Sequence, residues 1–209
     1  DSPYFYLSLT MMIIGTQLFV AGFVGEMISR NSPERNKYQI EKIIWQQTIS
    51  DEEISFYEPL GCCVRAIKRC NLQQGDNVLV VGLGSIGLIM AQAIQAMGYN
   101  VFACDLLEDR INLAKEKGIE AFNSCSLEDF DRTIKEKTDN YGVDAVFMTS
   151  GADKAIDVAI KTIKMGGKIL VFSSTPNNFG YANNEVYYKE LTVMGSYSPS
   201  PKDLQDSFE

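Results

Sequence analysis

The pattern of apolar and polar residues changes near residue 50. Residues 2–25 contain no charged side chain, and this run is longer than the roughly 20 residues that a helix needs to cross a bilayer. Beyond residue 50, short β-branched runs alternate with segments whose apolar residues recur at helical spacing. We expect residues 1–49 to form a hydrophobic, transmembrane helix with a basic juxtamembrane segment, and residues 50–209 to form a separate domain.

The residues that flank the N-terminal run match the two ends of a membrane-spanning helix. Aromatic residues occupy positions 4–6, and basic residues cluster at positions 30–37. Aromatic belts and cytoplasmic bases mark such ends. This predicts membrane contact for residues 4–25 and a cytoplasmic location for the domain that follows. A buried helix of a water-soluble protein is the alternative, because polar Thr16 and Gln17 interrupt the run.

The stretch from about residue 4 to residue 45 resembles the C-terminal membrane tail of family-2 polyprenyl-phosphate glycosyltransferases. The likeness is carried by GTQLFVAGFVGEMISRNSPERNKYQIEKI, in which a hydrophobic helix runs into Gly-Glu and a short basic segment. None of that family's nucleotide-sugar or metal-binding motifs is present. The resemblance therefore implies membrane insertion and no transferase activity.

A strand, a glycine-rich turn, a helix and a second strand follow one another at the start of the second domain. The apolar run VLVVG is typical of a buried parallel strand. It continues into GLGSIG, which places Gly82, Gly84 and Gly87 in the spacing G-x-G-x-x-G. Apolar residues then recur at helical spacing before the strand VFACD closes on Asp105. In this order of elements, a glycine-rich turn indicates dinucleotide binding.

Each part of this motif has a physical role. Gly82 permits the tight turn, Gly84 lets the backbone approach a pyrophosphate, and Gly87 lets the helix pack on the strand. The helix N-terminus at Ser85 offers N–H groups and a partial positive charge to the phosphates. The carboxylate of Asp105 can accept hydrogen bonds from the ribose hydroxyls of adenosine.

The choice of cofactor follows from charge. Asp105 would repel the 2′-phosphate of NADP, and the next residues, Leu106 and Leu107, carry no cation to receive one. NAD is therefore the predicted cofactor. Flavin and methyl-donor proteins also carry such glycines, but flavin domains usually open their chain with them and methyltransferase loops usually lack the third.

The rest of the chain continues the alternation of helices and strands. Ser126 with Asp129 forms a capping-box pair that starts a helix. The remaining expected elements are a strand at 145–150, a helix at 155–163 closed by Gly166-Gly167, and strands at 168–174 and 191–197. This pattern predicts an α/β fold, a Rossmann-type doubly wound parallel sheet that binds ligands at the carboxyl ends of its strands.

Composition excludes several kinds of chemistry. The formal charge of −8 argues against nucleic-acid binding. The chain has no histidine, which removes every triad, metal ligand and proton shuttle built on that residue. Five cysteines without C-x-x-C spacing indicate reduced thiols. Because the first residue is Asp1, we expect a fragment or a processed product.

The second domain resembles the medium-chain zinc-dependent alcohol dehydrogenases, nearest to the sorbitol, iditol and threonine dehydrogenases. The segments that carry the resemblance are EPLGCCVRAIKRCNLQQGDNVLVVGLGSIGLIMAQAIQAMG, VFACDLLEDRINLAKEKG, VDAVFMTSG and GGKILVFSS. It implies NAD and a small alcohol or polyol as ligands, and leaves a homo-oligomer open. The residues that it places at NAD, with the glycine motif, are Gly82, Gly84, Ser85, Ile86, Gly87, Asp105, Arg110, Phe172, Ser173, Ser174, Ser196 and Tyr197.

The chain departs from this family at the metal site. Glu58 matches the family's glutamate at the catalytic zinc, but the GroES-like catalytic barrel and the four-cysteine zinc loop are absent. A catalytic zinc needs about three protein ligands, so Glu58 alone cannot hold one. We assign no catalytic residue and do not expect this chain alone to bind zinc.

Three functions stay open at this point. The first is the coenzyme domain of an NAD-dependent alcohol or polyol dehydrogenase, truncated so that the chain alone does not turn over. The second is a membrane-tethered NAD-binding module without catalysis. The third is a fusion with, or a fragment of, a membrane glycosyltransferase.

Cell fractionation tests the predicted membrane segment. The full chain should sediment with membranes, because a charge-free helix of this length has no partner in the second domain, while residues 51–209 should stay in the supernatant. Recovery of both proteins in the supernatant would contradict the prediction.

Overall fold

The computed structural model describes residues 10–12, 14–18, 54–174 and 183–207. The chain divides into two compact units, residues 1–49 and 50–209. In the first unit the described residues are helical. Within the described ranges, no helix is both long enough and apolar enough to cross a bilayer. Most of the predicted membrane segment, and all of the basic segment at 30–37, lies outside these ranges.

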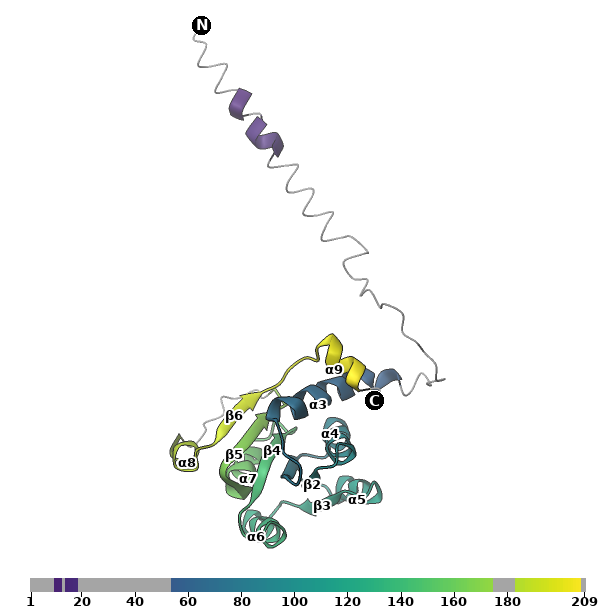
Figure 1. Ribbon diagram of the computed structural model, residues 1–209, viewed down its shortest axis with the longest axis vertical. Coiled ribbons are helices and arrows are strands. Elements are labelled where there is room, and N and C mark those ends of the chain that lie inside the picture. The colour runs from purple at the N-terminus through teal and green to yellow at the C-terminus, as the bar shows by residue number, and fades with distance from the viewer. Residues whose placement is uncertain (1–9, 13, 19–53, 175–182, 208–209) are drawn as a thin grey trace. The chain divides into compact units, whose positions relative to one another are not determined.

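The second unit is built on one six-stranded parallel sheet (Figure 1). Its strands lie in the order β3-β2-β1-β4-β5-β6, and every neighbouring pair is parallel. This order confirms the predicted doubly wound sheet. The strands are β1 (Asn77–Val81), β2 (Asn100–Asp105), β3 (Glu120–Asn123), β4 (Val143–Met148), β5 (Ile163–Val171) and β6 (Thr192–Gly195).

Helices cover both faces of the sheet, and successive strand residues point into different cores. In β1, Val78 and Val80 join one apolar cluster, whereas Leu79 and Val81 join the other. The first cluster contains residues of α3, α4 and α5, and the second contains residues of α6 and α7. The helices of this unit are α3 (Tyr57–Cys70), α4 (Ser85–Ala96), α5 (Glu108–Glu116), α6 (Leu127–Lys137), α7 (Lys154–Thr162), α8 (Asn183–Tyr188) and α9 (Pro201–Asp206).

The structure corrects the predicted boundary between α7 and β5. The helix ends at Thr162, and the strand begins at once with Ile163, which pairs with Val143. The pairing then shifts register before Lys168, so the two glycines lie in a bulge of β5 and do not close the helix. Gly166 has a φ of 70° there, a left-handed conformation that glycine adopts without steric cost.

The structure confirms the predicted start of α6 at Ser126, but one of the two hydrogen bonds there differs from those of a capping box. Ser126 is the N-cap residue, and its side chain accepts a hydrogen bond from the Asp129 N–H at 3.5 Å. The Asp129 carboxylate accepts from the Ser126 hydroxyl at 2.7 Å, whereas a capping box would bond it to the N-cap N–H.

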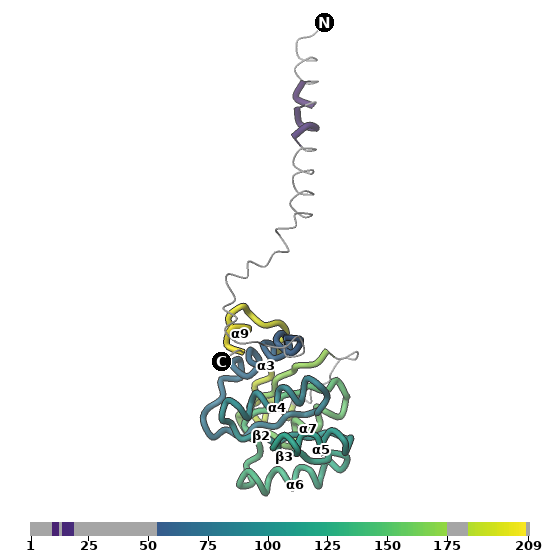
Figure 2. Tube along the Cα trace, turned by 90° about the vertical axis from the view of Figure 1, so that its right-hand side faces the viewer, coloured from purple at the N-terminus to yellow at the C-terminus, as the bar shows by residue number. Residues whose placement is uncertain are grey.

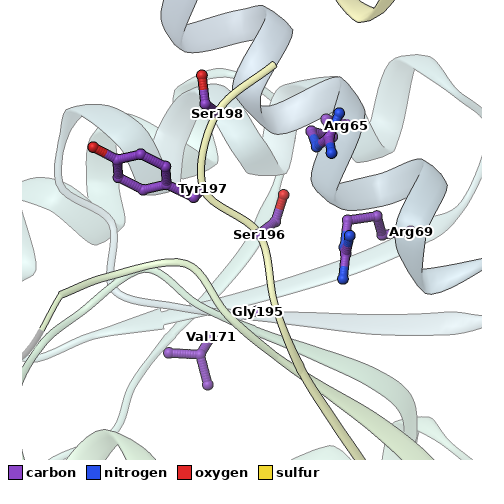
Figure 3. Close-up of a pocket in the computed structure, with 7 residues that line it drawn as sticks. All are labelled: Arg65, Arg69, Val171, Gly195, Ser196, Tyr197 and Ser198. Carbon is purple, nitrogen blue, oxygen red and sulfur yellow. The ribbon is translucent and has the colours of Figure 1, made fainter. Parts of the chain in front are cut away.

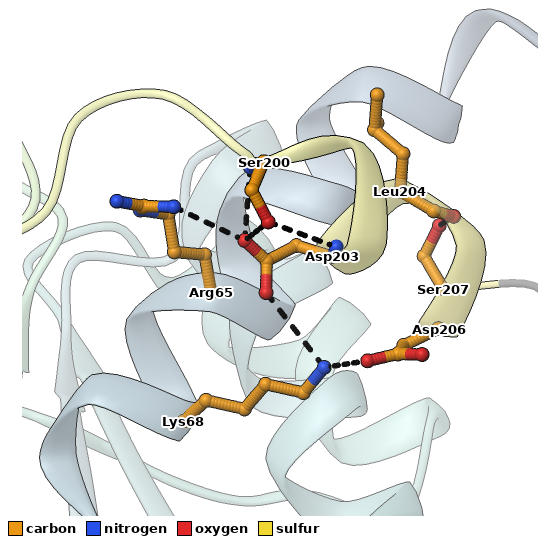
Figure 4. Close-up of polar contacts among 7 residues, drawn as sticks. All are labelled: Arg65, Lys68, Ser200, Asp203, Leu204, Asp206 and Ser207. Carbon is orange, nitrogen blue, oxygen red and sulfur yellow. Dashed lines mark hydrogen bonds and ion pairs between the residues drawn. The ribbon is translucent and has the colours of Figure 1, made fainter.

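The C-terminal helix α9 lies against α3, although the two are far apart in sequence (Figures 1 and 2). Ser200 and Asp203 form a reciprocal capping box at the start of α9. The Asp203 carboxylate also accepts from the Arg65 guanidinium at 3.2 Å and lies 3.7 Å from the Lys68 ammonium (Figure 4). Gly61 leaves room for α9, because an added Cβ would lie 2.7 Å from a Leu204 methyl carbon.

The Asp203 carboxyl has a pKa below its usual value of 3.8. Burial alone would raise this pKa, but hydrogen bonds from Ser200 and Arg65 and the charge of Lys68 outweigh that effect. The carboxylate therefore stabilises the fold fully above pH 3.8, and this contribution is lost as the pH falls through the lower folded pKa.

Replacing this carboxylate should loosen the attachment of α9. Near neutral pH, Asp203→Ala should lower the free energy of unfolding by about 1–3 kcal/mol, because two cations and a helix cap lose their acceptor. The loss should shrink as the pH falls below 3.8. Denaturant unfolding measures both effects. Asp157→Ala, which removes an exposed carboxylate on α7, is the control and should change stability by less than about 0.5 kcal/mol. Equal losses in the two variants would contradict the prediction.

Candidate dinucleotide site

The glycine turn joins β1 to α4 at very close range. Gly82 follows β1 with a φ of 98°, and its N–H donates to the Cys104 carbonyl at 2.8 Å. A Cβ added at Gly87 would lie 1.8 Å from the Gly82 carbonyl oxygen. A side chain at Gly87 would therefore force α4 away from the strand, so this glycine fixes where the helix begins.

Gly84 faces open space. It is the N-cap residue of α4, and a Cβ added there would meet no atom within 4 Å. Its φ of −65° and ψ of −173° are accessible to any residue. Neither backbone conformation nor packing requires glycine here, so this side of the turn is open to an approaching ligand.

The N-terminus of α4 supplies donors beside this open position. The first intrahelical bond runs from the Leu88 N–H to the Gly84 carbonyl at 2.9 Å. The N–H groups at the start of a helix have no intrahelical acceptor, which leaves those of Ser85 and Ile86 for an anion. Ser85 is exposed, while the side chain of Ile86 packs against the core.

Asp105, the last residue of β2, is held in place by the backbone of its own chain. One carboxylate oxygen accepts from the Leu83 N–H at 2.7 Å, and the other accepts from the N–H groups of Leu106 at 2.8 Å and Leu107 at 3.0 Å. Burial raises the pKa of this carboxyl, but these donors and Arg110 hold the pKa below its usual value. Asp105 is therefore ionised at neutral pH.

The structure places a cation beside Asp105 that the sequence argument on cofactor choice did not consider. Arg110, in the first half of α5, lies 3.4 Å from the Asp105 carboxylate, and its side chain is 48% exposed. The bond is long and exposed to solvent, so a ribose hydroxyl can replace the guanidinium. Arg110 is thus within reach of any group that the Asp105 carboxylate binds.

The predicted nicotinamide side of the site lies where β5 and β6 end. Phe172 and Ser196 are the first residues beyond these strands, and their N–H groups donate to Met148 at 3.0 Å and Val171 at 3.3 Å. The hydroxyl oxygens of Ser173 and Ser196 are buried without a hydrogen-bond partner in the part of the chain that the structure describes. Ser174 is exposed, and Tyr197 is 95% exposed.

Glu58 does not gather other metal ligands. It is exposed in the first turn of α3 and accepts from the Cys62 thiol at 3.3 Å. Burial, together with Glu58, raises the pKa of Cys62 to about 11, so this thiol stays protonated at neutral pH. Over the described ranges, no group of three or more His, Cys, Asp or Glu residues could hold a metal ion. A zinc ion therefore does not fit the residues seen here.

Two groups near the site were missed by sequence reasoning. The Thr149 hydroxyl, just beyond the end of β4, donates to the Gly82 carbonyl at 2.8 Å and to the Val81 carbonyl at 3.1 Å, so it holds the glycine turn in place. Arg65 and Arg69 of α3 line a pocket at the end of β6 (Figure 3). The spacing of four residues between these arginines was the available signal, but the segments that complete the pocket are more than a hundred residues away.

Comparison with known proteins gives a consistent result. Residues 85–209 match the zinc-binding dehydrogenase family. A sorbitol dehydrogenase of Halalkalibacterium halodurans is 32% identical, and the match covers 75% of this chain and 47% of that protein. A D-arabitol-phosphate dehydrogenase of Enterococcus avium is 31% identical, and the match covers 74% of this chain and 45% of that protein. The crystal structure of 2R,3R-butanediol dehydrogenase from Bacillus subtilis is 27% identical, with a TM-score of 0.68 over 75% of this chain and 46% of that one. The chain thus spans less than half the length of each of these relatives.

Two glycine substitutions should separate folding from binding. Gly87→Ala should lower the free energy of unfolding by about 2 kcal/mol or more, because the methyl group overlaps the Gly82 carbonyl. Gly84→Ala should lower stability by no more than about 1 kcal/mol, because alanine is a poorer N-cap residue than glycine. It should weaken NAD binding at least about tenfold, because the methyl group occupies the side on which a pyrophosphate approaches. Thermal unfolding and titration calorimetry measure the two effects. Tight NAD binding by Gly84→Ala would show that the cofactor does not approach at this turn.

Proposed function

Since the chain belongs to the zinc-type medium-chain alcohol dehydrogenase family, we propose that residues 50–209 are the NAD-binding domain of an oxidoreductase. The proposed reaction transfers a hydride between NAD and a secondary alcohol, such as a polyol. The names of the relatives point the same way, since they include dehydrogenases of sorbitol, D-arabitol phosphate and 2R,3R-butanediol.

The observation that carries this proposal is the open turn at Gly84 between a helix N-terminus and an ionised carboxylate. An added Cβ at Gly84 meets nothing within 4 Å, whereas one at Gly87 overlaps the backbone. A pyrophosphate can therefore approach the first N–H groups of α4, where the helix dipole favours negative charge. The adenosine ribose then lies toward Asp105 at the end of β2.

The charges around Asp105 favour NAD over NADP. Asp105 is ionised, and the N–H groups of Leu83, Leu106 and Leu107 hold its position. A 2′-phosphate would meet this carboxylate at short range. Arg110 offsets part of the repulsion, but its guanidinium is already paired with Asp105. The net effect is a site that accepts two hydroxyls better than a phosphate.

The ends of β5 and β6 would orient the nicotinamide. The buried hydroxyls of Ser173 and Ser196 lack partners among the described residues, and a buried donor without an acceptor is costly. A carboxamide oxygen is a suitable acceptor for the Ser173 hydroxyl. When bound, NAD accepts the hydride at C4 of its nicotinamide ring, so the task of these strand ends is to fix the face that the ring presents.

A substitution pair with opposite effects tests cofactor choice. Asp105→Ser should weaken NAD binding about tenfold or more and reduce the preference for NAD over NADP, because it removes a ribose acceptor and a repulsive charge. Arg110→Gln should leave NAD binding within about twofold and weaken NADP binding further, because it removes a cation beside Asp105.

Calorimetric titration of both cofactors measures these changes. The ratio of the two affinities is the decisive quantity, because Asp105→Ser also removes three backbone bonds and a general loss of folding lowers both affinities alike. Equal affinities of the natural chain for NAD and NADP would overturn the assigned specificity. Failure to bind either cofactor would overturn the proposed function.

A further inference from the structure

A pocket of about 480 Å³ lies between α3 and the segment that follows β6. Arg65 and Arg69 line it from one side, and Val171 and residues 195–198 line it from the other. Figure 3 shows the two arginines one turn apart on α3, with the Ser196 side chain turned toward them and the Tyr197 ring turned away. The volume is in the range of small-ligand sites.

The charged groups around this pocket leave an excess of positive charge. Arg65 is paired with Asp203 at 3.2 Å, and Lys68 is paired with Asp203 and Asp206. Arg69 is exposed and has no ion pair among the residues that the structure describes. Three cations therefore face two carboxylates, and the uncompensated one belongs to the pocket wall. A guanidinium presents a planar fork of donors that matches a phosphate group.

Ser196 adds a neutral donor to this wall. Its hydroxyl oxygen is buried and lacks a partner within the described ranges. Its backbone is held in place, because its N–H donates to the Val171 carbonyl at 3.3 Å. An anion between Ser196 and the arginines would accept a hydrogen bond from the hydroxyl and also neutralise the charge of the Arg69 guanidinium. A water molecule could accept the hydrogen bond but could not neutralise the charge.

The pocket is separate from the expected place of the NAD pyrophosphate. The pyrophosphate belongs at the N-terminus of α4 beside the end of β1, whereas the pocket is at the end of β6. β4 and β5 lie between these two strands, so three strand spacings, about 14 Å, separate the two ends. The pocket instead borders the strand ends where the nicotinamide is proposed to lie.

We propose that this pocket binds the phosphate group of the substrate, which makes the substrate a phosphorylated polyol. This inference rests on the proposed function, since the pocket would hold the phosphate while the carbinol carbon faces the nicotinamide. Arg69 and Ser196 contact the phosphate directly. Arg65 adds a second positive charge to the pocket, and its guanidinium is oriented by Asp203 of α9.

Titration calorimetry on the full 209-residue chain, with and without NAD, tests the proposal. The probes are sorbitol 6-phosphate, sorbitol as its uncharged match, and inorganic phosphate. The phosphorylated polyol should bind at least about tenfold more tightly than sorbitol. Arg69→Gln should abolish this preference, Arg69→Lys should restore part of it, and Ser196→Ala should reduce it about threefold.

Arg132→Gln is the matched control. It removes the same charge from a 69% exposed position on α6 and should leave the preference unchanged. Circular dichroism and thermal unfolding verify that each variant folds. Equal affinities for sorbitol and sorbitol 6-phosphate in the natural chain would overturn the proposal, as would an equal loss in Arg132→Gln.

Two further outcomes distinguish the sources of the anion. If inorganic phosphate competes with NAD, and Arg69→Gln weakens both equally, the pocket serves the phosphates of NAD and the substrate assignment fails. If NAD does not bind at all while the preference for the phosphorylated polyol persists, the proposed dehydrogenase function fails and the anion pocket stands.

Discussion

The close approach of α4 to the end of β1 is the constraint on which the site depends. A single methyl group at Gly87 would overlap the Gly82 carbonyl at 1.8 Å, so the helix can start here only while that position has no side chain. This contact puts the helix N-terminus directly over the carboxyl edge of the sheet. The same contact brings Leu83 to the Asp105 carboxylate. Helix position, turn conformation and the orientation of the acidic side chain are therefore set together.

Local patterns in the sequence predict most of the sheet and the glycine turn. The strands β1, β2 and β4 each contain a run of four apolar residues, and α4 has a clear helical period, so short windows of sequence are sufficient. The start of β5 could not be found in this way, because its bulge is stabilised by pairing with Val143 and by a bond between Gly166 and Lys189. The short strand β3 carries a single buried residue, Ala121, and gives almost no signal.

The site was predictable to a similar degree, and for a similar reason. The residues that lie within one βαβ unit follow from a single motif, as Gly82, Gly84 and Asp105 do. The groups that come from distant segments do not. Thr149 bonds to the glycine turn from the end of the neighbouring strand, 67 residues away in sequence. Asp203 contacts Arg65 over a separation of 138 residues. Such pairs depend on the completed topology, which no local window contains.

The contact between α3 and α9 has a mechanical consequence. These are the first and last helices of the described part of the second unit, and they lie against each other. The first and last helices of this described part are therefore joined directly by the ion pairs of Arg65 and Lys68 with Asp203. A force that separates α3 from α9 would act on these ion pairs first and would reach the hydrogen bonds of the sheet only after they break. The loops at the strand ends, where NAD is proposed to bind, would thus be shielded from tension transmitted along the backbone.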